Sequence, residues 1–117
     1  FIDLETIDTK INRDNIMDIV KGQQIICEAL DDPATKSMVV SEVLANSDDK
    51  LVIAASGMAG LGADNLIRTQ KKFSRLYICG DERSDFELTP GMMAPRVSIC
   101  AGHQANIILR LLMGLEG

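Results

Sequence analysis

Short apolar runs of strand length alternate along this chain with longer segments of helical character. Apolar and polar residues alternate over residues 1–11, which predicts a strand leading into a turn. Residues 14–22 predict a helix that Asn12 caps and Gly22 ends. Residues 23–30, QQIICEAL, show no such alternation. This run predicts a strand covered on both faces, as in a parallel sheet.

The second half of the pattern predicts a second helix, more strands and a closing helix. Asp32 before Pro33 marks a helix start, because proline needs no amide partner there and aspartate accepts the orphan N–H groups. This helix should run to about residue 45. The later segments predict, in order, a buried strand running into a glycine-studded loop, a shorter exposed strand or loop, another strand, a polar turn-rich segment and a helix: residues 50–60, 62–73, 75–81, 81–93 and 96–114.

This order of elements predicts the fold class. Strands that alternate with helices favour right-handed crossovers and a mainly parallel sheet with helices on both faces. The exposed segment 62–73 should add a mixed or antiparallel edge. We therefore expect an α/β chain that forms a doubly wound sheet of the Rossmann type, or the carboxyl-terminal half of one.

Composition narrows the class of protein. Hydrophobic residues make up 46% and charged residues 25%, as in a globular protein. The net charge of −5 argues against nucleic acid or an anionic membrane as a partner, and no apolar run approaches a membrane span. Three cysteines without CxxC spacing argue against a disulfide framework and a structural zinc site. We expect a cytoplasmic protein.

Two predicted strand ends hold candidate chemistry, because ligands of parallel sheets bind at the carboxyl ends of strands. At the first, Asp31 offers a carboxylate suited to magnesium, whereas Asp32 reads as the helix cap. The second is a glycine-rich loop without the dinucleotide fingerprint, which suits close approach of a ligand or peptide. Its residues are Ser56, Gly57, Met58, Ala59 and Gly60.

Cys100 and His103 stand three positions apart on the closing helix, the spacing of neighbours on one face. A cysteine beside a histidine can be an activated nucleophile. We expect instead a largely buried helix and an inert core thiol whose pKa is raised. The apolar face predicted to be buried contains Val97, Ala101, Ala105, Ile108 and Leu112, with Ile107 and Leu111 beside it.

Three stretches, ICEALDDPATK, LVIAASGMAG and GMMAPRVSICAGHQANIILRLLMG, together resemble the motifs of the ubiquitin-activating-like adenylating enzymes, the ThiF/MoeB/HesA superfamily. In that family a strand ends in Asp-Asn with Arg or Lys five positions after the aspartate. Here the residues are Asp31, Asp32 in place of Asn, and Lys36. The usual Gln-Ala pair is Gln104 and Ala105. The resemblance covers the whole chain and is greatest to the ThiF branch, which acts in thiamine biosynthesis.

The resemblance implies an ATP-dependent adenylyltransferase that activates the C-terminal glycine carboxylate of a ubiquitin-like sulfur carrier protein. It implies that Asp31 is a magnesium-associated catalytic carboxylate, that Lys36 is catalytic and that residues 56–60 lie near the carrier tail or nucleotide. ATP and Mg²⁺ would be the cofactors, without zinc, and a homodimer is the family habit. The segment 81–93 lacks the thiol of some relatives, which leaves Cys79 as a distant candidate for a covalent link.

The family's nucleotide-binding loop and phosphate-binding residues would precede Phe1. Residues 1–117 are therefore expected to form the carboxyl-terminal part of such a domain and to adenylate nothing alone. One alternative is a carrier-binding or dimerisation module without catalysis. Another is a fragment of a Rossmann dehydrogenase, against which the missing fingerprint counts.

Overall fold

The computed structural model describes residues 2–83 and 91–116 and contains four strands and three α-helices in those ranges. A one-turn 3₁₀ helix, η1, covers Asp64–Leu66. The helices and strands are α1 (Ile16–Ile19), β1 (Ile25–Cys27), α2 (Pro33–Ala45), β2 (Leu51–Ala55), β3 (Arg68–Phe73), β4 (Leu76–Gly80) and α3 (Ala94–Leu112).

The strands form one mixed sheet in the order β1-β2-β4-β3. The first three of these are parallel, with Cys27 opposite Ile53 and Ile53 opposite Tyr77. The fourth, β3, pairs antiparallel with β4 at the far edge. This confirms the predicted α/β class, a mostly parallel sheet with an antiparallel edge.

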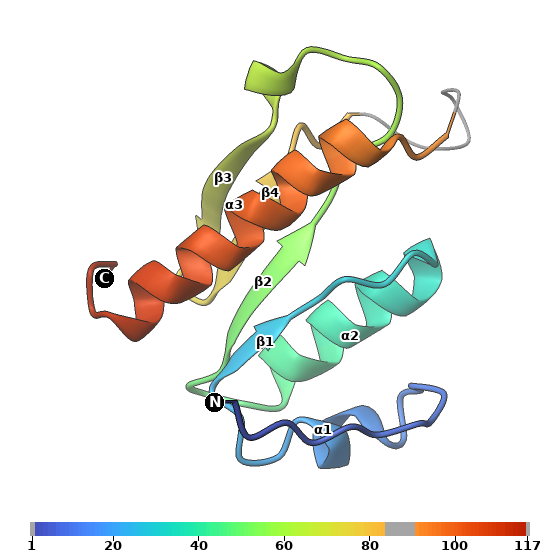
Figure 1. Cartoon of the computed structure of the whole chain (residues 1–117). Helices are drawn as coiled ribbons and strands as arrows, with labels where there is room; N and C mark the ends of the chain where they lie inside the picture. Colours follow the sequence, from blue (N-terminus) through green and yellow to red (C-terminus); the bar gives the residue numbers. More distant parts are fainter. Residues whose placement is uncertain (1, 84–90, 117) are drawn as a thin grey trace.

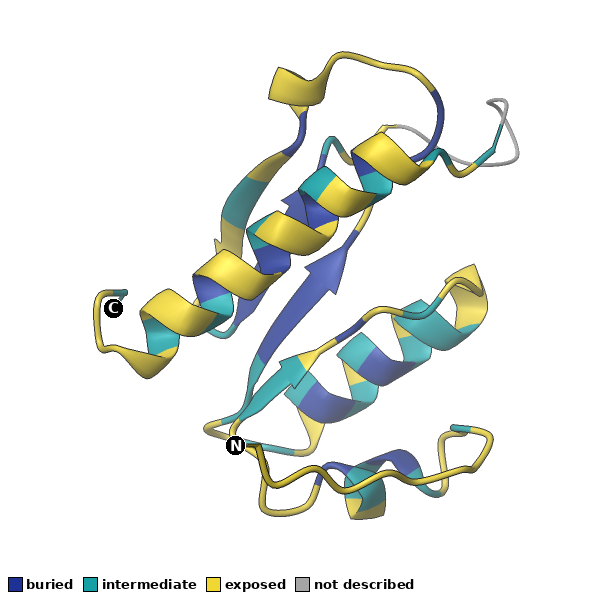
Figure 2. Ribbon diagram, viewed as in Figure 1, coloured by how far each residue is buried: buried dark blue, intermediate teal, exposed yellow. Residues whose placement is uncertain are grey.

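Helices cover both faces of the sheet, as predicted (Figure 1). Because successive residues of a strand point to opposite faces, β2 supplies both cores. Val52 and Ala54 pack in the core shared with α1 and α2, whereas Ile53 and Ala55 pack in the core shared with α3. The central strand is consequently buried along almost its whole length (Figure 2). Among the described residues, no helix is long and apolar enough to cross a membrane.

The strand predicted over residues 1–11 is wrong for residues 2–11, which form neither helix nor strand. Ile2 and Leu4 are 89% and 77% exposed. An alternating segment becomes a strand only where a neighbour accepts its backbone, and the described sheet has none for it. The following helix, α1, ends at Ile19 rather than at Gly22, which adopts a φ of +80° in the turn beyond.

The first strand is shorter and more open than predicted. β1 pairs only with β2 in the described sheet, and Cys27 at its end is exposed. The apolar run 23–30 thus correctly predicts a parallel strand, but full coverage is wrong because β1 lies at the edge.

The buried face of α3 also differs from the predicted one. Val97 and Ile108 are half-buried, and Ala101, Ala105 and Leu112 are exposed. The fully buried side chains are Arg96, Cys100, Gln104 and Ile107, of which Cys100 and Ile107 agree with the prediction. Hydrophobicity alone could not identify this face, because two of its four members are polar residues that hydrogen-bond to the sheet and its loops.

The backbones of β2 and β4 approach each other very closely at the carboxyl ends of these strands. Ser56 N–H donates to Cys79 O over 2.9 Å, and Glu82 N–H donates to Ser56 O over 3.0 Å. Gly80 has a φ of +138°, and a Cβ there would lie 1.7 Å from Ser56 O. Only glycine permits this approach, because both its dihedral angle and its space exclude a side chain.

We expect Gly80→Ala to destabilise the chain by roughly 2 kcal/mol or more, since strain and a backbone clash act together. Gly102 on α3 is the matched control, because nothing lies within 4 Å of a Cβ there. Gly102→Ala should raise the free energy of unfolding by up to about 1 kcal/mol through helix propensity. Urea unfolding of both variants measures the difference, and equal stabilities would contradict the close crossing.

Candidate functional site

A cavity of about 610 Å³ opens at the carboxyl ends of β1 and β2, between the start of α2 and the first half of α3. Its lining residues come from β2, α2 and α3 and from the segments that follow β1, β2 and β4. The lining includes five residues singled out in the sequence: Asp31, Lys36, Ser56, Gly57 and Met58. Its apolar wall includes Leu30, Met58, Met92, Val97 and Ala101. The two predicted strand ends therefore meet in one site, as expected of parallel neighbours.

The two adjacent aspartates have different positions. Asp32 caps α2, with its carboxylate accepting from the Thr35 backbone N–H over 2.9 Å and from the Thr35 hydroxyl over 2.6 Å. The hydroxyl bond first, and then the backbone bond, lowers the pKa of Asp32. The stabilisation is therefore present above the ordinary pKa and is lost as the pH falls through the lowered one. The cap is confirmed, whereas Asp31 is exposed and lines the cavity.

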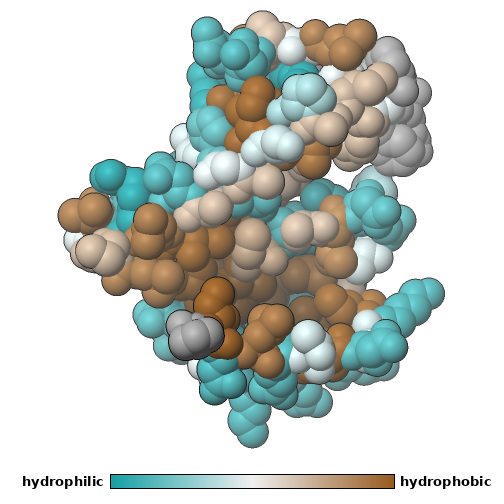
Figure 3. All heavy atoms as spheres, viewed as in Figure 1, coloured by the Kyte–Doolittle hydropathy of each residue, from teal (hydrophilic) through white to brown (hydrophobic). Residues whose placement is uncertain are grey.

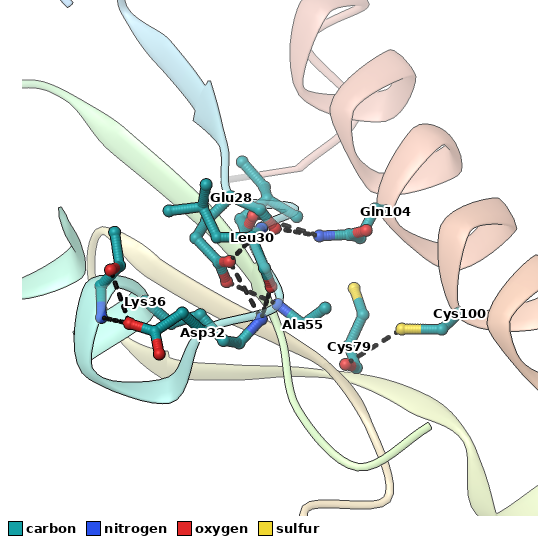
Figure 4. Close-up of polar contacts among 10 residues, drawn as sticks. Glu28, Leu30, Asp32, Lys36, Ala55, Cys79, Cys100 and Gln104 are labelled. Carbon is teal, nitrogen blue, oxygen red and sulfur yellow. Dashed lines mark hydrogen bonds and ion pairs between the residues drawn. The ribbon is translucent and has the colours of Figure 1, made fainter. Parts of the chain in front are cut away.

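Lys36 is held in place by a partner that the sequence analysis missed. Its ammonium donates to Glu28 Oε1 over 2.9 Å and to Leu30 O over 2.8 Å (Figure 4). The Lys36 side chain is 21% exposed, whereas that of Glu28 is 1% exposed. Lys36 is therefore a partly buried member of an ion pair at the cavity wall.

The Glu28 carboxylate accepts three hydrogen bonds. Besides Lys36, Oε1 accepts from Leu30 N–H over 2.7 Å, and Oε2 accepts from Ala55 N–H over 3.3 Å. Its backbone oxygen also accepts from Gln104 Nε2 over 2.9 Å. A buried carboxylate is tolerated because it is paired and hydrogen-bonded. One signal could have identified Glu28: it is the only charged residue within an apolar run that was predicted to be buried.

The glycine-rich loop divides into two parts. Ser56, Gly57 and Met58 line the cavity. Ala59 and Gly60 do not line it and are buried. Gly60 N–H donates to Gly91 O over 2.8 Å, which ties the loop to the start of the last segment. Of the five predicted loop residues, the first three are thus in position to contact a ligand.

A second buried ion pair, between Arg96 and Asp81, holds this loop in place. Arg96 Nη2 lies 2.8 Å from Asp81 Oδ2, and both side chains are less than 10% exposed. Arg96 Nη1 donates to Ala59 O over 2.7 Å. The pair thus joins α3 to the ends of β2 and β4. Sequence reasoning missed both residues, since an arginine in the first turn of a helix is usually on the surface.

Cys100 is a buried core thiol, as predicted. Its Sγ donates to Cys79 O over 3.3 Å, and desolvation raises the pKa of Cys100 to about 11. His103 contacts Thr69, with 2.9 Å between Nδ1 and Oγ1. Burial also raises the pKa of Cys79, the distant candidate for a covalent link. Residues 84–90 of the predicted turn-rich segment lie outside the described residues.

Within residues 2–83 and 91–116, no group of three or more His, Cys, Asp and Glu side chains is placed to hold a metal ion. Magnesium usually needs less from a protein, since one or two carboxylates together with phosphates and waters suffice. The exposed carboxylate of Asp31 at the cavity fits this requirement.

Comparisons with known proteins add no assignment: no family model matches the chain, and no curated protein or solved structure is significantly similar to it.

We expect iodoacetamide at pH 8 to label exposed Cys27 first and to leave Cys100 unmodified in the folded chain. With a pKa of about 11, only about one Cys100 in a thousand is a thiolate at that pH. Peptide mass spectrometry with and without urea measures the labelling of each thiol, and urea should expose Cys100. Rapid labelling of folded Cys100 would restore the nucleophile interpretation.

Proposed function

We propose that this chain forms the carrier-binding part of an ATP-dependent adenylating enzyme. The enzyme activates the C-terminal glycine carboxylate of a ubiquitin-like sulfur carrier in thiamine biosynthesis. One observation supports this most: Asp31, Lys36 and the loop residues Ser56 to Met58, which the motif resemblance assigns to the site, line one cavity. Their position at the ends of adjacent parallel strands is where such folds bind ligands.

The proposed reaction joins the carrier carboxylate to the α-phosphorus of ATP and releases pyrophosphate. Bound at Asp31, Mg²⁺ would neutralise charge on the phosphates. The chain's own residues bind and orient the tail. A tail ending in glycine has no side chain to accommodate, so it fits beside Gly57, while the apolar wall excludes water from the reacting carboxylate.

In the described sheet, β1 is paired on one side only. Its open edge supports the proposal that strands from another part of the enzyme extend the sheet and contribute the nucleotide site. Leu51 N–H donates to Gln24 O, and Glu28 N–H donates to Ile53 O. Because backbone groups alternate along a strand, those of Ile25 and Cys27 point away from β2. An apolar surface lies beside this edge, between α3 and β1 (Figure 3). Parallel sheets are normally covered at such places, which favours a part of the enzyme packing here.

The second candidate function is a carrier-binding module without catalysis. One observation favours it: residues 1–117 contain no glycine-rich phosphate loop of either common type. Both candidates require the cavity to bind the carrier tail, so tail binding is tested first and nucleotide chemistry second.

We expect the chain to bind a peptide that ends in Gly-Gly with a free carboxylate, and to bind the amidated peptide at least tenfold more weakly, since the neutral amide loses the attraction of a carboxylate to Arg83, a cationic residue of the cavity lining. Ala101→Glu should weaken binding at least tenfold by placing a charge inside the cavity. Chemical-shift titration of the labelled chain measures both affinities.

Ala105→Glu is the matched control, because Ala105 is an exposed alanine on the same helix that does not line the cavity. Equal binding by both variants would contradict the assigned site.

Pyrophosphate exchange by this chain with ATP, Mg²⁺ and carrier would contradict a nucleotide site outside it. Binding of NAD in the cavity would favour a dehydrogenase instead.

A further inference from the structure

The ion pair between Glu28 and Lys36 engages both polar backbone atoms of one residue. Leu30 N–H donates to Glu28 Oε1 over 2.7 Å, and Leu30 O accepts from Lys36 Nζ over 2.8 Å. The same two side chains contact each other over 2.9 Å. The three residues thus form a closed ring of hydrogen bonds around the backbone of Leu30 (Figure 4).

This ring lies directly before a residue of the cavity lining, Asp31, in the chain. Leu30 directly precedes Asp31, and β1 already ends at Cys27. The segment between β1 and α2 therefore has no strand pairing to fix it, apart from the Glu28 N–H bond to β2. The side chains of Glu28 and Lys36 supply the fixation that a sheet would otherwise give.

We propose that Glu28 and Lys36 act as a clamp on the Leu30 backbone and thereby position the Asp31 carboxylate at the cavity. Both are positioning residues, and Lys36 acts through Asp31 rather than by touching the substrate. In its cation-binding aspect this inference rests on the proposed function, which makes Asp31 the ligand of a divalent cation. The clamp itself depends only on the contacts around Leu30.

The chemistry of the pair explains why these residue types are required. Three hydrogen-bond donors face the Glu28 side chain, so a group that only accepts hydrogen bonds is needed there. A carboxylate meets this requirement, whereas a side-chain amide also carries donors. Lys36 uses two of its three protons on Glu28 and Leu30. Hydrogen bonds to charged groups are stronger than neutral ones, and burial of Glu28 strengthens them further.

The test uses the labelled chain with Mn²⁺ alone as the probe. Two quantities are measured: the hydrogen-exchange rate of the Leu30 amide relative to that of the core amide of Ile53, and the Mn²⁺ affinity from paramagnetic broadening around Asp31. In Lys36→Met, we expect the exchange ratio to rise about tenfold and the affinity to fall about tenfold, as loss of a charged hydrogen bond predicts.

Lys36→Met leaves the buried Glu28 charge without its cation and could unfold the chain. The double variant Glu28→Gln/Lys36→Met removes both charges and is the second test. It should show the same two changes with a smaller loss of unfolding free energy. Because Glu28 and Lys36 act as one unit, the double variant should lower the Mn²⁺ affinity by no more than Lys36→Met does.

Val43→Ala is the control for a general loss of stability, because Val43 is a fully buried α2 residue in the core that α2 shares with the sheet. It should lower the free energy of unfolding and leave the exchange ratio and the Mn²⁺ affinity unchanged. The clamp is overturned if both Lys36 variants keep the wild-type exchange ratio, or if Val43→Ala weakens Mn²⁺ binding as much as they do.

Failure of the proposed function gives a different result. If Asp31→Asn binds Mn²⁺ as the wild type does, Asp31 is not a cation ligand and that part of the proposed function fails. The Leu30 exchange ratio in the Lys36 variants still decides whether the clamp exists.

Discussion

One buried carboxylate, that of Glu28, fixes the relative positions of the strands and helices around the cavity. Glu28 sits at the end of the edge strand, accepts from Ala55 at the end of the central strand and pairs with Lys36 on α2. Through its backbone oxygen it also binds Gln104 of α3. Removing a buried charge from its partners costs far more than losing an apolar contact, so these elements keep one relative position. The cavity lies where they meet.

The sequence predicted those features that follow from local chemistry and periodicity. Asp32 and Pro33 predicted the start of α2 because capping depends on neighbours in the chain. The apolar runs predicted β2 and β4, which are buried on both sides. The meeting of Asp31 with the Ser56 loop followed from the rule that parallel strands end at one edge. These expectations needed no knowledge of tertiary contacts.

The features that were mispredicted depend on partners distant in the chain. The buried face of α3 includes Arg96 and Gln104, whose burial depends on distant partners, among them the carbonyl groups of Ala59 and Glu28. Those acceptors are separated from them by 37 and 76 positions. Counting apolar residues therefore selected the neighbouring face, which carries Ala101 and Ala105. Residues 2–11 have the pattern of a strand, but pattern cannot supply the neighbour that pairing requires.

The short edge strand explains why side chains rather than backbone pairing hold the site. β1 has three residues and, in the described sheet, one neighbour, so its ladder contributes few hydrogen bonds. A strand added on the open side would bond to Ile25 and Cys27, whose backbone groups point outward. It would not replace the bonds at Leu30, because both polar backbone atoms of that residue are already engaged by Glu28 and Lys36. Covering the edge would therefore stabilise β1 without displacing Asp31, and the cavity would keep its geometry when the sheet is extended.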